Sequence, residues 1–179
     1  MSISRQNLSV LIVSFFSDEV IHNCIESIPK DLKILVVDNS GNRDFKKKIE
    51  KKYKNTKCLL SSENLGMGSG NNLGLKHANT HYVLILNPDV VLEKNSIDEL
   101  IEASKKIDKF GIIAPVIKSS RKLNYKLLDK NYPVGDKNIP FKVKSVDGFA
   151  MLLNLKELNQ INLLKNFNFF DEKIFLFLE

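Results

Sequence analysis

The sequence is poor in the residues that build disulfide frameworks and soft metal centres. It has two cysteines, Cys24 and Cys58, which lie far apart in apolar patterns, and only three histidines. No CxxC, HExxH or HxH spacing occurs, and these are the spacings typical of structural or catalytic metal sites. We therefore expect two buried, reduced thiols and no metal centre built from cysteine or histidine.

Long hydrophobic runs are also missing, and so are the common phosphate-binding motifs. No apolar stretch reaches the length of a membrane span, and no small-residue cleavage site follows the short run Leu8–Phe16. The glycines at 66, 68, 70 and 74 do not match GxGxxG, and no Lys-Ser/Thr pair of a P-loop follows them. We therefore expect a cytoplasmic protein that binds phosphate groups through neither a GxGxxG loop nor a P-loop.

Charge is the next constraint on the partners of this protein. The 179 residues suggest one domain with a sizeable core, and the net charge of +6 comes from lysines, seven of which crowd the segment from Lys46 to Lys57. Such a run favours a solvated helix face, and an anionic membrane leaflet is the alternative. Nucleic acid is not an expected partner, because the aromatic residues are not interleaved with the lysines.

Strand and helix patterns alternate through the first two thirds of the chain. Apolar runs predict strands, and apolar residues at helical spacing predict helices. The predicted strands are Leu8–Phe16, Ile34–Val37, Lys57–Leu60, Tyr82–Leu86 and Gly111–Ile117. The predicted helices are one capped by Ser17 and running to Ile28, one over Arg43–Lys54, one after a Gly/Asn-rich loop at Asn64–Asn72, and one starting with a Ser96–Glu99 capping box. This alternation predicts an α/β fold, a mostly parallel sheet with helices on both faces.

The pattern weakens after Ser119. Lys122–Lys144 is polar and predicts an irregular excursion, whereas Val146–Leu153 is apolar again apart from Asp147-Gly148. The tail Phe167–Leu178 is strongly aromatic, and the sequence stops at Glu179.

Three predicted strands end in acidic or polar residues. These ends are Ser14–Ser17, Asp38–Ser40 and Asn87–Asp89, and in a parallel sheet they share one edge, where ligands bind. Pro88 stops strand pairing and presents Asp89, whose carboxylate is well placed to hold a divalent cation against a diphosphate. Asp38 can accept from an N–H of a nucleobase, with a simple turn or cap aspartate as an equal alternative. The glycines near Gly66 allow either ligand approach or dense helix packing.

Taken together, these motifs resemble family 2 glycosyltransferases of the rhamnosyltransferase-like branch. The matching segments are Val13-Ser14-Phe15, Val36–Ser40, Glu63–Gly74, Leu86–Asp89, Asp147–Ala150 and Phe170–Glu179. They follow the order of the family over nearly the whole chain, and the Asn-rich segment stands at the expected separation from Asn-Pro-Asp.

The resemblance implies a Rossmann-like GT-A fold and an inverting transfer of a sugar from a nucleotide diphosphate sugar. It implies one nucleotide-sugar-binding domain over 1–179, with a nucleotide-binding half at 1–118 and a partial acceptor-side half at 119–179. Asp89 would hold Mg²⁺ or Mn²⁺, with Asn87 where a first Asp often stands, and the base would be Glu179, with Asp147 nearby. The implied nucleotide-sugar site comprises Ser14, Phe15, Asp38, Asn39, Asn64, Gly66, Gly70, Asn72 and Asn87.

The acceptor would be a polysaccharide or a lipid-linked oligosaccharide in cell-surface glycan synthesis, at the inner face of the membrane. The family's base belongs to a Glu-Asp pair, and the sequence stops at the first member, so we expect a C-terminally truncated domain. Its tail aromatics (Phe167, Phe169, Phe170, Phe175 and Phe177) would be exposed and favour self-association into a homo-oligomer. The alternative is a catalytically silent fragment that acts as a binding module or completes a longer enzyme. A nucleotidyltransferase is disfavoured, because Ser14–Asp18 offers no phosphate loop.

Overall fold

The computed structural model describes residues 2–117, 123–129, 139–160 and 168–172. Its strands are β1 (Leu8–Ser14), β2 (Lys33–Asp38), β3 (Thr56–Leu60), β4 (Tyr82–Leu86), β5 (Ile112–Ile113), β6 (Tyr125–Lys126), β7 (Ser145–Val146) and β8 (Ala150–Asn154). Its helices are the short 3₁₀ turn η1 (Arg5–Asn7), α1 (Ile21–Ser27), α2 (Arg43–Lys52), α3 (Gly66–His77), α4 (Ser96–Lys105) and α5 (Leu155–Gln160).

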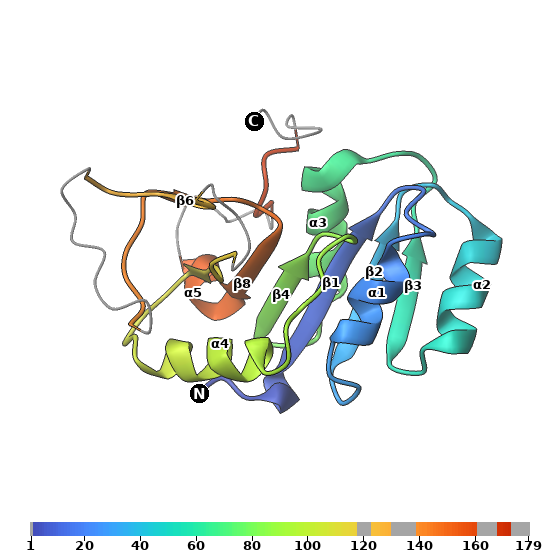
Figure 1. Cartoon of the computed structure of the whole chain (residues 1–179). Helices are drawn as coiled ribbons and strands as arrows, with labels where there is room; N and C mark the ends of the chain where they lie inside the picture. Colours follow the sequence, from blue (N-terminus) through green and yellow to red (C-terminus); the bar gives the residue numbers. More distant parts are fainter. Residues whose placement is uncertain (1, 118–122, 130–138, 161–167, 173–179) are drawn as a thin grey trace.

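Six of the strands form one twisted sheet in the order β3-β2-β1-β4-β8-β5 (Figure 1). Strands β1 to β4 are mutually parallel, and β8 runs antiparallel to both β4 and β5. The chain moves outward from β1 to β3 and then returns to place β4 on the other side of β1. Strand order therefore reverses beside β1, which is the place where open α/β sheets bind ligands. The predicted α/β fold with a mostly parallel sheet is confirmed.

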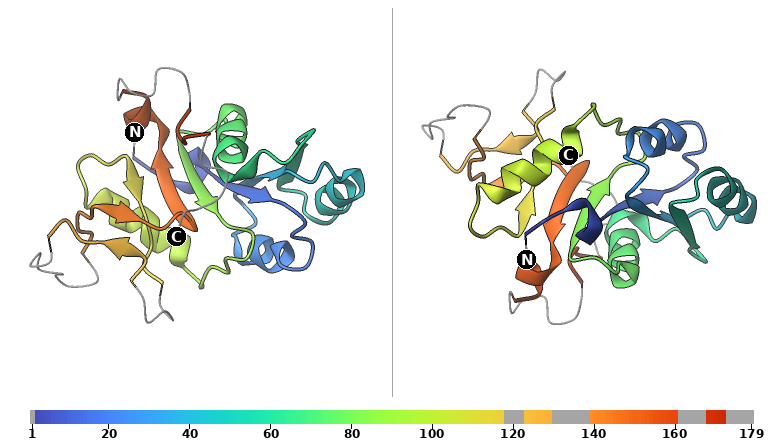
Figure 2. Two further views of the ribbon diagram at one scale, coloured as in Figure 1. Left: turned by 90° about the horizontal axis from the view of Figure 1, so that it is seen from above. Right: turned by 90° about the horizontal axis from the view of Figure 1, so that it is seen from below.

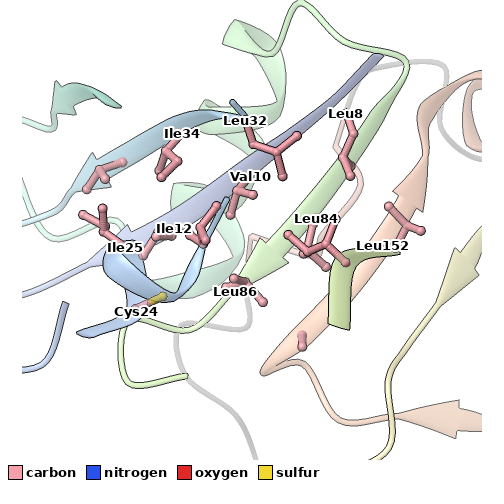
Figure 3. Packing of buried hydrophobic residues seen from close by; sticks show 14 of the residues in the cluster. Leu8, Val10, Ile12, Cys24, Ile25, Leu32, Ile34, Leu84, Leu86 and Leu152 are labelled. Atoms are coloured by element: carbon pink, nitrogen blue, oxygen red, sulfur yellow. The ribbon is translucent and has the colours of Figure 1, made fainter. Parts of the chain in front are cut away.

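Helices cover both faces of the sheet, as the sequence predicted. Figure 2 shows α3 on the face opposite α1 and α4. The larger core cluster joins β1, β2 and β4 to α1, α2 and α4, and Figure 3 shows Ile12, Cys24 and Leu86 packed within it. A smaller cluster on the other face joins the sheet to Leu75 of α3 and Leu158 of α5. Strands buried on both faces read as continuous apolar runs, which explains why the prediction of Tyr82–Leu86 matches β4.

Several predicted element boundaries are wrong. Ser17 does not cap α1, which begins at Ile21, and the Ser17 hydroxyl instead bonds to the backbone of Phe15. The N-cap of α4 is Asn95, in a left-handed conformation, so Ser96 is the first helical residue and forms no capping box. The predicted strand Gly111–Ile117 shrinks to Ile112–Ile113, the two residues that pair with β8.

The Gly/Asn-rich segment and the tail also differ from expectation. Residues 66–72 are not a loop but the first turns of α3. Of the tail aromatics, Phe169 and Phe170 are not exposed; they are half-buried and pack against the smaller core cluster. Phe167, Phe175 and Phe177 lie outside the described residues. None of the helices in the described part of the chain has the length and apolar character needed to cross a bilayer.

Candidate functional site at the carboxyl edge of the sheet

The predicted site residues of three strands meet at one edge of the sheet, here called the carboxyl edge. Ser14, at the end of β1, is the register partner of Asp38, at the end of β2. On the other side, Ile12 of β1 pairs with Leu86, so Asn87 follows β4 at the same level. Because neighbouring strands lie about 4.8 Å apart, these strand ends form one continuous rim.

Asp38 organises the turn that follows β2. Its side chain is 1% exposed and accepts hydrogen bonds from the Ser40 hydroxyl, at 2.9 and 2.7 Å to the two carboxylate oxygens, and from the Asn42 backbone N–H at 3.0 Å. These bonds supply the partners that a buried carboxylate requires. In this structure the carboxylate holds the turn from Asp38 to Asn42 in place, and its role in recognising the nucleobase stays a prediction.

Asn39 ties β1, β2 and α3 together at the rim. Its backbone N–H donates to the Ser14 carbonyl at 2.8 Å, and its side-chain Nδ2 donates to the Gly66 carbonyl at 3.0 Å. Gly66 has a φ of +71°, a conformation that glycine adopts without steric cost, and its N–H donates to Asn64 Oδ1 at 3.1 Å. The start of α3 is thereby fixed directly beside the strand ends.

Glycines allow α3 to approach the sheet at this edge. A Cβ at Gly70 would lie 2.8 Å from Val13 Cγ1 and 3.3 Å from Asn39 Nδ2. Real Cβ atoms essentially never come that close, so the packing requires glycine there. Of the two interpretations left open by the sequence, dense helix packing is what the structure displays. Ligand approach to this segment stays a prediction.

Four buried side-chain atoms near the rim have no hydrogen-bond partner within the described residues. They are Ser14 Oγ, Asn39 Oδ1, Asn71 Oδ1 and Asn87 Oδ1. Nearly all buried polar atoms in proteins are paired, so unsatisfied atoms at a strand-order reversal indicate a place where a polar ligand or water completes the bonding. Asn71 was not singled out from the sequence. Its place in the run Gly70-Asn71-Asn72, directly before a residue that was singled out, is the sequence signal that would have found it.

The segment after β4 presents the candidate metal carboxylate. The Asn87 N–H donates to the Phe149 carbonyl at 2.8 Å, and the Asn87 carbonyl accepts from Val90 N–H at 3.1 Å. This turn holds Asp89 exposed beyond the strand end. Burial raises the pKa of the nearby Cys24 thiol to about 12, and the negative charge of Asp89 adds to that shift. Both expected thiols are buried and unpaired, as predicted.

The described residues contain no group of three or more His, Cys, Asp or Glu side chains that could hold a metal ion by themselves. Asp89 and the unpartnered Oδ1 of Asn87 offer hard oxygen ligands of the kind that Mg²⁺ and Mn²⁺ take. Such a sparse set fits an ion that brings its other ligands with it, as a metal–diphosphate complex does.

Of the two predicted catalytic carboxylates, the structure describes one. Asp147 precedes β8, and its N–H donates to the Asn124 carbonyl at 2.9 Å while its side chain is exposed. Because β8 is antiparallel to β4, with Ala150 opposite Leu86, the residues leading into β8 arrive at the carboxyl edge. Glu179 lies outside the described residues.

Two adjacent aromatic side chains stand exposed where β1 ends. Phe15 and Phe16 are 46% and 70% exposed, and their rings meet edge to face with centroids 4.6 Å apart. Phe16 has a φ of +49°, a strained conformation for an aromatic residue and one of the kinds that cluster at functional sites. Sequence reasoning identified Phe15 and missed Phe16, although a Phe-Phe pair directly after a buried strand was a usable signal.

Asn72, predicted to line the nucleotide pocket, instead forms hydrogen bonds through its side-chain amide with the chain segment 168–172 in this structure.

Two surface hollows, of about 520 and 290 Å³, lie at the opposite, amino-terminal edge of the sheet and contain none of the predicted site residues. The first is lined by Thr80, His81 and Lys156, among others, and the second by Ser2, Tyr82 and Asn154, among others.

Two curated relatives have sequences similar to this one. A low-salt glycan biosynthesis hexosyltransferase of Haloferax volcanii is 31% identical over 115 residues, which are 62% of this chain and 36% of the relative. A teichoic acid poly(glycerol phosphate) polymerase of Staphylococcus epidermidis is 30% identical over 118 residues, 61% of this chain and 16% of the polymerase. The matched part therefore spans about a third or less of each relative.

Solved structures share the fold. A mannosyltransferase of Pyrobaculum calidifontis in complex with GDP-Man and Mn²⁺ superimposes with a TM-score of 0.64, at 14% identity, over 87% of this chain and 46% of the other. S. aureus TarS in complex with UDP gives 0.63, at 18% identity, over 94% and 51%. These matches identify the fold as that of GT-A glycosyltransferases. The sequence profile of the family Glycosyl transferase family 2 matches residues 9–175, nearly the whole sequence, and the chain therefore belongs to that family.

Proposed function

We propose that this chain is the nucleotide-sugar-binding domain of an inverting glycosyltransferase of the rhamnosyltransferase-like branch. It would move a sugar from a nucleotide diphosphate sugar to a polysaccharide or lipid-linked oligosaccharide in cell-surface glycan synthesis. One observation carries the proposal. Ser14, Asp38 and Asn87–Asp89 converge at the edge of the sheet where strand order reverses, beside buried polar atoms that no described side chain satisfies.

The nucleoside would lie across the ends of β1 and β2. Phe15 and Phe16 offer exposed rings for stacking on a base. The unpartnered side-chain oxygens of Asn39 and Ser14 would accept from an N–H group of the base or a hydroxyl group of the ribose. Asp38 would hold the turn beside the base in shape or would itself accept from the base. Gly66 and Gly70, with Asn64, keep the start of α3 close to the ligand.

The diphosphate would extend toward Asn87 and Asp89, which would hold Mg²⁺ or Mn²⁺. When bound, the ion neutralises charge that grows on the leaving diphosphate as the glycosidic bond breaks. Asp89 contributes a formal negative charge and Asn87 a carbonyl oxygen, so this chain's share of the ion's ligands is small. We therefore expect the ion to bind tightly only together with a nucleotide.

A base on the opposite face of the sugar would take the proton of the acceptor hydroxyl. The family resemblance assigns this role to Glu179, and Asp147 is exposed where the chain enters β8 at the same edge. A base that faces the anomeric carbon from the side opposite the diphosphate gives inversion, because the hydroxyl attacks in line with the departing group.

Calorimetric titration with UDP, GDP and dTDP in the presence of Mn²⁺ tests the binding part of this proposal. We expect one of the three to bind, and we expect Asp89→Asn to weaken that binding by about tenfold or more through the loss of a charged oxygen ligand. Asp44→Asn, an exposed carboxylate on α2, is the matched control. Absence of binding by the folded protein, or an Asp89→Asn variant equal to wild type, would refute the site.

Turnover separates the enzyme from the silent module. Released nucleoside diphosphate, measured with the nucleotide sugar of the base that binds, supports transfer or donor hydrolysis by this chain. Tight binding without release supports the module that completes a longer enzyme. The proposal of a transferase acting alone then fails.

The lysines of α2 suggest contact with an anionic membrane leaflet. Lys46, Lys47 and Lys52 pair with Glu50, Asp44 and Glu26, which lowers the net charge of this face. Exposed Lys48 and Lys51 add positive charge to the same helix. Each lysine near an anionic surface contributes about 1 kcal/mol, so Lys48→Glu/Lys51→Glu should release the protein from phosphatidylserine vesicles. Equal sedimentation of variant and wild type with these vesicles would refute the contact.

A further inference from the structure

Asn72 holds a distant segment of the chain through three hydrogen bonds. Its Nδ2 donates to the Phe170 carbonyl at 2.9 Å and to Glu172 Oε1 at 3.1 Å, and its Oδ1 accepts from the Phe170 N–H at 3.0 Å. The Asn72 residue is 1% exposed. The side-chain amide thus pairs with both backbone groups of Phe170, as a neighbouring strand would.

Apolar packing fixes the same segment. Phe169 and Phe170 lie against the smaller core cluster, which contains Leu11 and Val13 of β1. Figures 1 and 2 show the red segment 168–172 running beside α3. The segment therefore has a polar anchor, the amide of Asn72 on α3, and an apolar anchor, the packing of the two rings on the smaller core cluster.

The same helix is anchored at the carboxyl edge. Asn39 Nδ2 donates to the Gly66 carbonyl at the start of α3, and Gly70 packs directly on Val13. Asn72 follows Gly70 by two residues in the same helix. A single rigid element therefore connects the rim that would bind the nucleotide with the point from which the chain continues toward Glu179.

We propose that Asn72 is a positioning residue that seats the segment 168–172 on α3 and so sets the starting point of the stretch carrying the catalytic base. This inference rests on the proposed function. Both polar atoms of the Asn72 side chain are already engaged by Phe170 and Glu172, so Asn72 acts through that segment. The sequence had assigned it to the nucleotide pocket.

The sharpest variant is Asn72→Asp, which keeps the size of the side chain and changes its bonding. It replaces the donating Nδ2 with an oxygen that faces the Phe170 carbonyl and the Glu172 carboxylate. Glu172→Gln in the same chain restores a donor at that point and removes the charge repulsion. Asn72→Ala removes all three hydrogen bonds, and Lys76→Gln, exposed one turn further along α3, is the control.

Three measurements on the full chain decide the matter: amide hydrogen exchange at Phe170, the Kd of the nucleoside diphosphate with Mn²⁺, and the maximal rate of nucleoside diphosphate release. In Asn72→Asp we expect exchange at Phe170 to accelerate at least tenfold, the rate to fall at least tenfold, and the Kd to stay within twofold. Asn72→Asp/Glu172→Gln should recover much of both losses. Exchange at β4 amides reports whether each variant remains folded.

Several results would overturn the inference. If amide exchange at Phe170 is unchanged in Asn72→Asp while nucleotide binding is intact, Asn72 does not hold the segment 168–172 on α3, and only this inference is refuted. Loss of nucleotide affinity by the same factor as the rate makes Asn72 a direct contact of the sugar donor. If the wild type binds the nucleotide but does not cleave the nucleotide sugar to nucleoside diphosphate, this chain has no active base for Asn72 to position, and the inference fails. A wild type that binds no nucleotide refutes the proposed function itself.

Discussion

Replacement of Gly74 by alanine tests the close packing of α3 on the central strand. A Cβ at this position would lie 2.2, 2.7 and 3.0 Å from Cδ1, Cδ2 and Cγ of Leu11. Leu11 is 1% exposed on β1, so its side chain has no open space to enter. Overpacking a core in this way costs about 1 to 3 kcal/mol, whereas alanine gains about 1 kcal/mol of helix propensity over glycine. We expect a net loss of about 1 kcal/mol in the free energy of unfolding.

Urea denaturation measures this loss. With an m-value of about 2 kcal/mol per molar urea, the midpoint should fall by about 0.5 M at unchanged m. Ser69→Ala, half-buried on the same helix, is the control and should raise the midpoint slightly through helix propensity alone. Adding Leu11→Val to Gly74→Ala shortens the opposing side chain, and the pair should show a favourable coupling of about 1 kcal/mol. A Gly74→Ala protein more stable than wild type would refute the close packing.

Two further predictions concern the cysteines and the start of α2. Burial raises the pKa of both Cys24 and Cys58 to about 12, so at pH 8 native thiols should react with Ellman's reagent about a thousandfold more slowly than after unfolding in guanidinium chloride, and rapid labelling of the native protein would contradict this burial. Because the folded-state pKa values lie above those of the unfolded chain, the stability that the two thiols contribute is present below about pH 9 and is lost as the pH rises toward 12. At the start of α2, Asn42 Oδ1 accepts from the Asp44 and Phe45 N–H groups at 3.0 Å each. Asn42→Ala should therefore lower the free energy of unfolding, measured by urea titration, by about 1 kcal/mol, whereas Asn42→Asp, which keeps an acceptor, should not. Equal stability of the two variants would argue against the cap.

The sequence predicted the sheet better than the helix beside the site. Runs such as Tyr82–Leu86 are apolar because both faces of the strand are buried, so pattern and structure agree. The segment from Gly66 to Asn72 read as a loop, since glycine and asparagine have low helix propensity. In the structure it is helical, and tertiary packing overrides the low propensity: Gly70 and, just beyond the segment, Gly74 let α3 lie close against Val13 and Leu11.

The candidate site divides in the same way. Strand ends follow from topology, so the convergence of Ser14, Asp38 and Asn87 could be predicted before any coordinates. The partners of single side chains could not. Asn72 meets Phe170, 98 residues away, and Asp38 bonds within its own turn, which are outcomes of three-dimensional packing that spacing does not reveal.

The antiparallel strand β8 affects how the sheet is completed during synthesis. β4 is buried along its whole length, with β1 on one side and β8 on the other. Until the ribosome has delivered residues 150–154, the outer margin of β4 has no backbone partner and offers an apolar template to other chains. A shortened protein that stops before β8 should therefore aggregate even though it retains Ser14, Asp38 and Asp89, and studies of nucleotide binding need the chain at least through Asn154.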